Sequence, residues 1–422
     1  MPEQKKAVVP RLRFPEFRDA GPWEYRKLER HLEPYNERVP ASGCNLPIYT
    51  SSRDGLISQK DYFDGRELIN EGEYGVVPPG YFVYRHMSDD ATFKFNLNNT
   101  GGSIAVSKEY PVFTTHAVVD LFLLFLLNEG EHFKRFAATQ RKGGTRTRLY
   151  FATLCSCSLP MPSIPEQQKI ADCLSSLDEL IELEAKKLEA LQAHKKGLMQ
   201  QLFPREGETT PRLRFPEFRD AGPWEVKRLG EIVEIINERA GDKKCTLLSV
   251  TAGIGLVSQV EKFGREIAGK QRRNYFILRK NDFAYNKSAT KDYPEGYIGL
   301  YEGDEIAAVP NSIFVCFRPA QEKVVPRYLR FLFEINVHGR WMRRFITVGA
   351  RAHGSLNIDN HNLLHIPIPL PATAVSIPEQ QKIADCLSSL DELIELQAKQ
   401  LEALQAHKKG LMQQLFPQEI DL

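Results

Sequence analysis

Cationic and amide side chains gather in three short stretches of this chain, and they carry its most suggestive chemistry. The stretches are Gln140–Arg148 (QRKGGTRTR), Asn286–Lys291 (NKSATK) and Gly349–Gly354 (GARAHG). Arginine and lysine can neutralise phosphates, while arginine pairs with guanine, and asparagine or glutamine with adenine. The same residues are also common in ordinary solvated loops, so one stretch alone decides little.

Catalytic motifs are absent from the sequence. The chain lacks the Asn/Asp-Pro-Pro-Tyr/Phe motif by which adenine methyltransferases hold the target amine, and it lacks a glycine-rich cofactor fingerprint. Gly264–Gln271 (GREIAGKQ) nearly matches a P-loop, but it ends in glutamine where serine or threonine should hold magnesium. The seven cysteines form no metal-binding pattern. We therefore expect a chain that is not an enzyme by itself and binds neither metal nor cofactor.

The bulk composition is that of an ordinary globular protein, with 42% hydrophobic residues. Lysine and arginine number 56 against 54 acidic residues, so any basic surface must arise from local clustering. Met1–Pro10 does not resemble a cleavable signal. The apolar run Ala117–Leu127 is about half as long as a membrane span and contains Asp120, so we predict a buried helix. We expect a cytoplasmic location, reduced thiols and no membrane association.

An internal repeat dominates the organisation of the chain. Ser163–Pro204 returns as Ser376–Pro417, with Glu184 replaced by Gln397 and Lys187 by Gln400. Pro10–Leu28 returns, slightly changed, as Pro211–Leu229. Each copy thus reads as a short segment, a variable domain and a long helix. The predicted boundaries are 1–162 for the first segment and domain, 163–204 for the first helix, 205–375 for the second segment and domain, and 376–422 for the second helix and tail.

The repeated helices carry a coiled-coil pattern, because their apolar residues alternate at spacings of four and three. Ser163–Glu166 has the S-x-x-E capping-box pattern, and Pro204 and Pro417 end the helical pattern. The expected seam residues are Ile170, Leu174, Leu177, Ile181, Leu188 and Leu191, with Ile383, Leu387, Leu390, Ile394, Leu401 and Leu404 in the second copy. We predict an antiparallel pair of rods about 60 Å long. The alternative is that each helix packs on its own domain.

Four further leucines widen the apolar face of the helices beyond the seam: Leu180, Leu183, Leu393 and Leu396. They suggest packing on a third element or on a partner protein. The variable regions, 29–160 and 230–372, contain short β-like runs and one later helical stretch each, near Val118–Leu127 and Pro326–Ile335. The expected fold class is α+β, with two tandem domains each followed by a helix of about 40 residues.

At this point the sequence resembles the specificity subunits of type I restriction-modification systems. The resemblance covers nearly the whole chain. It rests on the duplicated order, on the helix start Ile164–Ala171 (IPEQQKIA) and on its copy Ile377–Ala384. Asn281–Lys287 (NDFAYNK) also resembles a recurrent element of the family's target-recognition domains. Its first-domain counterpart, Gly80–His86, departs from it by having Arg85 and His86 at the last two positions.

The resemblance implies that each variable domain reads one half of a split, asymmetric DNA target in the major groove. It further implies that the helices set the gap between half-sites, which should lie about 34 Å apart when read from one face of the duplex. Two modification subunits would dock on the helices and domains and methylate adenine with S-adenosylmethionine. Restriction subunits, which use ATP and magnesium, would join them.

The basic stretches lie at comparable points of two related domains. This placement favours a role in DNA binding over the alternative that they are ordinary solvated loops. The candidate DNA-binding residues are Arg85, Arg141, Lys142, Arg146, Arg148, Asn286, Lys287, Lys291, Arg351 and His353. Two other hypotheses remain open. One is a coiled-coil scaffold that binds proteins and not DNA, and the other is a free-standing methyltransferase or nuclease, against which the missing motifs argue.

Overall fold

The computed structural model describes residues 8–65, 72–141, 146–251, 255–267, 270–290, 293–346, 356 and 358–417. The chain divides into two compact units. The first unit comprises Met1–Ala185 and Lys399–Leu422, and the second comprises Lys186–Ala398. Each unit therefore contains one variable domain together with part of both long helices, and the first unit is built from two separate pieces of chain.

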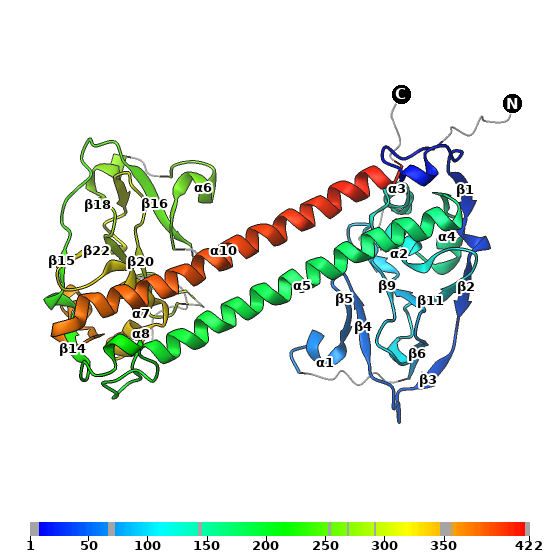
Figure 1. Cartoon of the computed structure of the whole chain (residues 1–422). Helices are drawn as coiled ribbons and strands as arrows, with labels where there is room; N and C mark the ends of the chain where they lie inside the picture. Colours follow the sequence, from blue (N-terminus) through cyan, green and yellow to red (C-terminus); the bar gives the residue numbers. More distant parts are fainter. Residues whose placement is uncertain are drawn as a thin grey trace. The chain divides into compact units, whose positions relative to one another are not determined.

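The first unit is built around antiparallel sheet (Figure 1). Its four-stranded sheet has the order β2 (Leu32–Tyr35), β11 (Val112–Thr115), β7 (Phe82–Tyr84), β9 (Phe95–Leu97). A three-stranded sheet has the order β10 (Ile104–Ser107), β6 (Glu73–Val77), β3 (Arg38–Pro40). The hairpin of β4 (Tyr49–Ser52) and β5 (Gly55–Ser58) leads into α1 (Gln59–Tyr62).

The second unit repeats this topology although its sequence has diverged. Its first sheet has the order β15 (Val233–Ile235), β22 (Phe314–Pro319), β19 (Phe283–Asn286), β20 (Tyr297–Leu300). Its second sheet has the order β17 (Gly255–Ser258), β16 (Thr246–Thr251), β21 (Ala307–Val309), β18 (Phe276–Leu278), and α6 (Gln259–Phe263) follows β17. Stacked phenylalanine rings join equivalent strands in both units, Phe82 on Phe113 and Phe283 on Phe317. The predicted common α+β fold is confirmed.

Helices cover the four-stranded sheet in each unit. In the first they are α2 (Asp120–Glu129) and α3 (Glu131–Thr139), and in the second α7 (Pro326–Glu334) and α8 (Val337–Met342). The apolar run read as a buried helix is α2, where Phe122, Leu123 and Leu126 are buried. Among the described residues, no helix has the length and apolar character that a membrane span requires.

The repeated N-terminal segments are attached to the long helices by buried ion pairs. Arg13 donates to both carboxylate oxygens of Glu166, at 2.7 and 2.6 Å, and Trp23 Nε1 donates to Glu166 at 3.3 Å. Arg214 and Glu379 repeat the arrangement at 2.8 and 2.7 Å. The glutamate that the S-x-x-E pattern assigned to a capping box is thus engaged by an arginine far away in sequence. A carboxylate in the first turn also complements the helix dipole.

Two small sheets also join the repeated N-terminal segments to the strands that precede the long helices. β1 (Glu24–Lys27) pairs with β13 (Ser158–Met161), and β14 (Glu225–Arg228) pairs with β23 (Pro367–Leu370), both antiparallel. The remaining short elements are η1 (Pro15–Phe17), η2 (Leu28–Arg30), α4 (Phe151–Cys155), η3 (Pro216–Phe218), η4 (Leu229–Glu231), η5 (Lys270–Asn274), α9 (Asn360–Leu364) and η6 (Thr373–Val375).

The long helices are α5 (Ile164–Leu202) and α10 (Ser376–Leu415). Within the first unit Asp178 pairs with Lys408, and Gln400 donates to Glu184 at 3.3 Å. Within the second unit Lys195 contacts Asp391 at 2.6 Å. Residue numbers fall on one helix as they rise on the other, so the helix segments run antiparallel in each unit, as predicted.

The coiled-coil pattern agrees with the burial of the helices. Ile170, Leu174, Ile383 and Leu387 are buried, and the other expected seam residues are half-buried. The helix ends also enter the domain cores. Met412, Leu415 and Phe416 belong to the first core, and Met199, Leu202 and Phe203 to the second. Coiled-coil pairing and packing on a domain therefore occur together in the same helices.

Candidate nucleic-acid interface

A two-stranded pairing in the first unit brings separate basic segments together. β8 (Met87–Ser88), which follows Arg85 and His86, pairs antiparallel with β12 (Thr147–Arg148). The Leu149 N–H donates to the His86 carbonyl at 2.8 Å and extends the pairing. The buried Tyr84 hydroxyl donates to the Leu149 carbonyl at 3.0 Å. Arg85 is thereby placed beside the segment that carries Arg146 and Arg148, which the sequence alone did not predict.

The segment from Arg146 to Tyr150 alternates strictly between exposed and buried residues. Thr147 and Leu149 are only 3% and 0% exposed, so they face the core. Arg146, Arg148 and Tyr150 therefore project from the opposite, solvent-facing side of the segment. We call Arg146, Arg148 and Tyr150 the exposed row. Sequence reasoning ended the cluster at Arg148 and missed Tyr150, although one more step of the alternation would have reached it.

The arginines in and beside this row differ in whether an acidic side chain pairs with them. Arg146 contacts Asp89 at 3.2 Å, an exposed pair of small energetic value. Arg85 and Arg148 are exposed and have no ion-pair partner among the described residues. Two guanidinium groups are thus available for an anionic ligand. Arg141 is exposed too, whereas the predicted site residue Lys142 lies outside the described residues.

The turn after β8 is held by Asp90. Its Oδ1 accepts hydrogen bonds from the Ser88 hydroxyl at 2.7 Å, from Arg53 at 2.6 Å and from the Thr92 N–H at 3.1 Å. These donors, Ser88 first, hold the pKa of Asp90 well below its usual range. The carboxylate is therefore ionised at neutral pH, and it fixes the backbone that follows β8.

The second unit places its own candidate residues at the equivalent point. Asn286 ends β19, and the Leu356 N–H donates to the Lys287 carbonyl at 2.6 Å. This contact matches the one between Leu149 and His86 in the first unit. Asn286 and Lys287 are half-buried, and Asn286 Oδ1 accepts from the Ser288 N–H at 2.9 Å. The predicted site residues Lys291, Arg351 and His353 lie outside the described residues.

Helix α8 supports the loop that follows Lys287. His338 Nε2 lies 3.4 Å from the Gly296 carbonyl, and Arg343 pairs with the buried Glu295. Burial lowers the pKa of His338 to about 4, so its ring is neutral at neutral pH. Arg344 lies over the Trp341 ring at 5.3 Å from its centroid. Arg343, the residue after α8, is therefore already engaged in positioning this loop.

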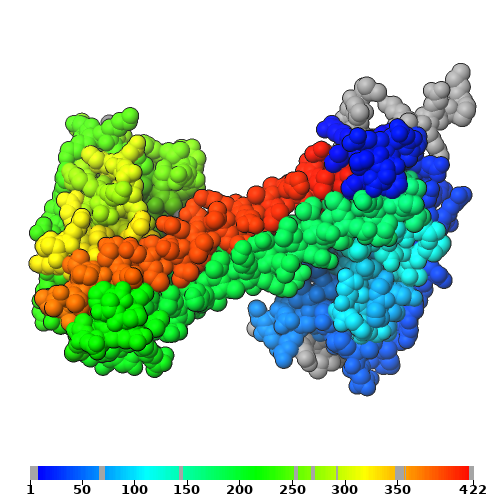
Figure 2. All heavy atoms as spheres, in the orientation of Figure 1, coloured from blue at the N-terminus to red at the C-terminus, as the bar shows by residue number. Residues whose placement is uncertain are grey.

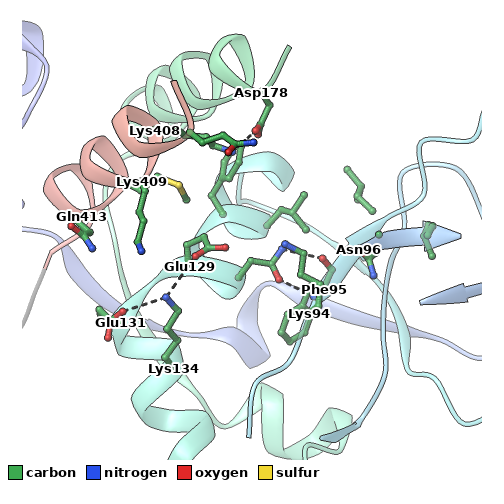
Figure 3. Close-up of a pocket in the computed structure, with 18 of the residues that line it drawn as sticks. Lys94, Phe95, Asn96, Glu129, Glu131, Lys134, Asp178, Lys408, Lys409 and Gln413 are labelled. Atoms are coloured by element: carbon green, nitrogen blue, oxygen red, sulfur yellow. Dashed lines mark hydrogen bonds and ion pairs between the residues drawn. The ribbon is translucent and has the colours of Figure 1, made fainter. Parts of the chain in front are cut away.

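The first unit also contains a cavity of about 600 Å³ lined by residues of α2, α3 and the last turns of α10 (Figure 3). Its Lys134 contacts Glu129 and Glu131, and its Lys408 pairs with Asp178. Most of its charges are thus compensated internally, which makes it a weak anion site. Among the described residues, no group of three or more histidine, cysteine or acidic side chains is placed to hold a metal ion.

Ion pairs occupy the corresponding place in the second unit. Arg330 pairs with Asp391, and Lys195 contacts Glu334 at 2.5 Å. The positions equivalent to Arg330 and Glu334 in α2 carry Leu124 and Asn128, both of which line the cavity. The cavity therefore arises from a local difference in packing between related domains and is not part of the basic surface.

Comparison with known proteins agrees with this architecture. Residues 92–193 and 222–406 match the family described as type I restriction modification DNA specificity domain. The chain is 25% identical over 314 residues to the type I restriction enzyme MjaVIII specificity subunit of Methanocaldococcus jannaschii, covering 71% of this chain and 70% of that one. It is 24% identical over 388 residues to the putative MjaX specificity subunit of the same organism, covering 84% and 86%.

Solved structures support the same fold. The S subunit of a type I restriction-modification system from M. genitalium superposes with a TM-score of 0.57 at 14% identity, covering 98% of this chain and 100% of that chain. A chain from a structure on complex assembly and conformational transition of the type I system gives 0.52 at 15% identity, covering 94% and 98%. Specificity subunits recognise DNA targets as the non-catalytic components of these systems and assemble with their other subunits. Because the family match covers residues 92–193 and 222–406, more than half of the sequence, this chain belongs to the specificity subunits of type I restriction-modification systems.

Proposed function

We propose that the chain reads a bipartite, asymmetric DNA target, with one half-site bound by each variable domain. The observation that carries this proposal is the pairing of β8 with β12, which gathers Arg85, Arg146 and Arg148 on one exposed edge. The contact between Leu356 and Lys287 marks the equivalent point of the second domain. Related folds with different residues at the same place are what two different half-sites require.

The cations are suited to hold phosphates at this edge, and base edges supply the sequence information. Each phosphate that a cation neutralises releases counterions, so binding should weaken steeply with salt. Arg148 is the sharpest test because it is exposed and lacks an ion-pair partner among the described residues. Arg148→Ala should lower affinity for all sequences similarly and reduce the slope of log K against log salt by about one.

The matched control is Arg26→Ala. Arg26 belongs to the same unit, but it lies on β1 and pairs with Glu24 at 3.4 Å, away from the exposed row. Binding of the complex with its modification subunits to the target duplex would be measured between 50 and 200 mM salt. An unchanged salt slope in Arg148→Ala would contradict a phosphate contact at this residue. If alanine variants of Arg85 and Arg146 also left the salt slope unchanged, the result would favour a scaffold that binds proteins and not DNA.

Modularity gives an independent test. Replacing residues 230–372 with the second domain of another family member should change one half of the methylated motif and leave the other half intact. The motif is obtained by mapping methylated adenines in genomic DNA from cells that carry each version. A change in both halves, or in neither, would refute the assignment of one half-site to each domain.

We further propose that two modification subunits dock on the exposed faces of the long helices. Leu183 and Leu396 are each 63% exposed, and Leu180 and Leu393 are exposed as well. Figure 2 shows outer faces of both helices uncovered on the side that it depicts. The four leucines occupy the same two positions of the repeated helix, so they offer two copies of one apolar site. Two equivalent sites fit two copies of the same partner.

Leu183→Glu combined with Leu396→Glu should abolish co-purification of the modification subunits, because a charge placed in an apolar contact is desolvated without a partner. Gln192→Glu is the matched control, since Gln192 is an exposed polar residue of the same helix. Separately, we propose that the modification subunits bind S-adenosylmethionine and that the restriction subunits bind ATP and magnesium. A complex that forms normally with both leucines replaced would refute this docking surface.

A further inference from the structure

Tyr150 ends the exposed row that begins with Arg146 and Arg148. Its side chain is 56% exposed, although the flanking Leu149 is fully buried. Its backbone is extended, with φ −72° and ψ 156°, and the Leu149 N–H is bonded to the His86 carbonyl. The alternation of an extended segment therefore places the tyrosine ring on the same side as the two guanidinium groups.

His86 lies against one face of the Tyr150 ring. The ring centroids are 5.5 Å apart, and the planes are stacked at 27°. His86 is only 6% exposed, and its Nδ1 has no hydrogen-bond partner among the described residues. The imidazole thus acts as a buried support that orients the tyrosine, while the high exposure of Tyr150 leaves the rest of its ring open to solvent.

We propose that the Tyr150 ring makes an apolar contact with base edges in the half-site bound by the first domain. This inference rests on the proposed function. Arg148 precedes Tyr150 by two residues, and Arg85 precedes its support His86, so the uncharged ring is flanked by cations suited to phosphates. In the major groove, apolar contacts distinguish base pairs, most clearly through the thymine methyl group. Tyr150 is then a specificity-determining residue and His86 a positioning residue.

The Tyr150 ring is well suited to this role because its side chain loses little conformational entropy on binding DNA. A tyrosine has two side-chain torsions, and rigid aromatic contacts have a low entropic cost. Stacking on His86 reduces that freedom before DNA arrives. Single exposed aromatic residues are common on protein surfaces. What separates Tyr150 from them is the combination of a buried aromatic support and cations on the same edge that have no ion-pair partner within the described part of the chain.

The test uses the full chain in complex with its modification subunits. Once the methylated motif is mapped, duplex pools randomised at one motif position at a time are bound, and the bound fraction is sequenced. Tyr150→Leu should reduce the preference for the favoured base roughly tenfold at one or two positions of one half-site. Tyr150→Phe should keep that preference. The other half-site, read by the second domain, serves as the internal control.

His86→Ala should give a smaller loss at the same base positions, without changing the salt slope that Arg148→Ala changes. If Tyr150→Leu keeps every base preference while Arg148→Ala weakens binding, the ring contact is refuted and the proposed function stands. If neither variant affects binding, the DNA contact proposed for this edge of the first domain fails as well. If Tyr150→Phe loses as much as Tyr150→Leu, a hydrogen bond of the hydroxyl carries the contact and the apolar proposal is wrong. Tyr150→Phe, which alters only one exposed oxygen, keeps the test valid should Tyr150→Leu fail to fold.

Discussion

Phe416 and Phe203 occupy the same position of the repeated helix ends, yet they should stabilise different units. Phe416 is 2% exposed in the core of the first unit, where its ring centroid lies 5.9 Å from that of Phe122. Phe203 is 2% exposed in the core of the second unit, 5.5 Å from Tyr328. We predict that Phe416→Ala destabilises the first unit, whose other segment is Met1–Ala185, and spares the second.

The expected magnitude follows from burial. Truncating a fully buried phenylalanine to alanine costs about 3–5 kcal/mol, because transfer free energy is lost and a cavity is left. For a unit of this size, each kcal/mol lowers Tm by about 2–4 °C, so the shift should be about 6–20 °C. Phe203→Ala should produce a similar shift in the second unit. The pair of variants forms a matched control, since the chemistry is identical and only the unit differs.

Tryptophan fluorescence can separate the two transitions. Trp23 is buried in the first core, and Trp224 and Trp341 belong to the second unit. In a Trp224→Phe, Trp341→Phe background, only the first unit reports unfolding, and Trp23→Phe gives the complementary reporter. A loss of stability in the second unit on Phe416→Ala, with the first unaffected, would refute the assignment of the C-terminal turns to the first core. Equal losses in both units would indicate one cooperative transition.

Three further outcomes follow from single contacts. Glu166→Gln should destabilise the first unit by about 3–5 kcal/mol in the same fluorescence assay, since it leaves a buried arginine uncompensated; a loss below 1 kcal/mol would contradict this. The pKa of His338 is lowered to about 4 by burial, so the unfolded state binds a proton first on acidification and the stability of the second unit should fall between about pH 6.5 and pH 4. His338→Gln should flatten that dependence in denaturation measured across this range, and an unchanged slope would count against it. Gln400→Lys, placed beside Glu184, should stabilise the first unit by about 0.2–1 kcal/mol at low salt, and 1 M salt should remove the gain.

The long helices were predictable because their signals are local. The spacing of Ile170, Leu174 and Leu177 needs only the helical period to predict one buried stripe. The repeat then indicated that the two variable regions share a fold, which the corresponding orders of the sheets β2-β11-β7-β9 and β15-β22-β19-β20 confirm. The buried-helix interpretation of Ala117–Leu127 rested on the same kind of local pattern, and α2 begins only three residues later.

Contacts between distant segments could not be predicted in this way. The pairing of Arg148 with Met87 joins two strands of two residues each, too short to leave a periodic signal. Arg13 looked like one cation among many, yet it is the buried partner of Glu166. A local rule assigned that glutamate to a helix cap and gave no sign of its contact with Arg13. The candidate site shows the same limit, since Tyr150 acquires meaning only from its stacking on His86.

Reciprocal use of the two helices explains why their sequences are nearly the same. The N-terminal turns of each copy pack in the core of the domain that precedes it, and its C-terminal turns complete the core of the other unit. Ile170 lies in the first core and Met199 in the second, while Ile383 lies in the second and Met412 in the first. Substitutions in either copy can therefore disturb the packing of both cores. The divergent strands carry no such double constraint, which leaves the candidate DNA-binding residues free to differ between the two domains.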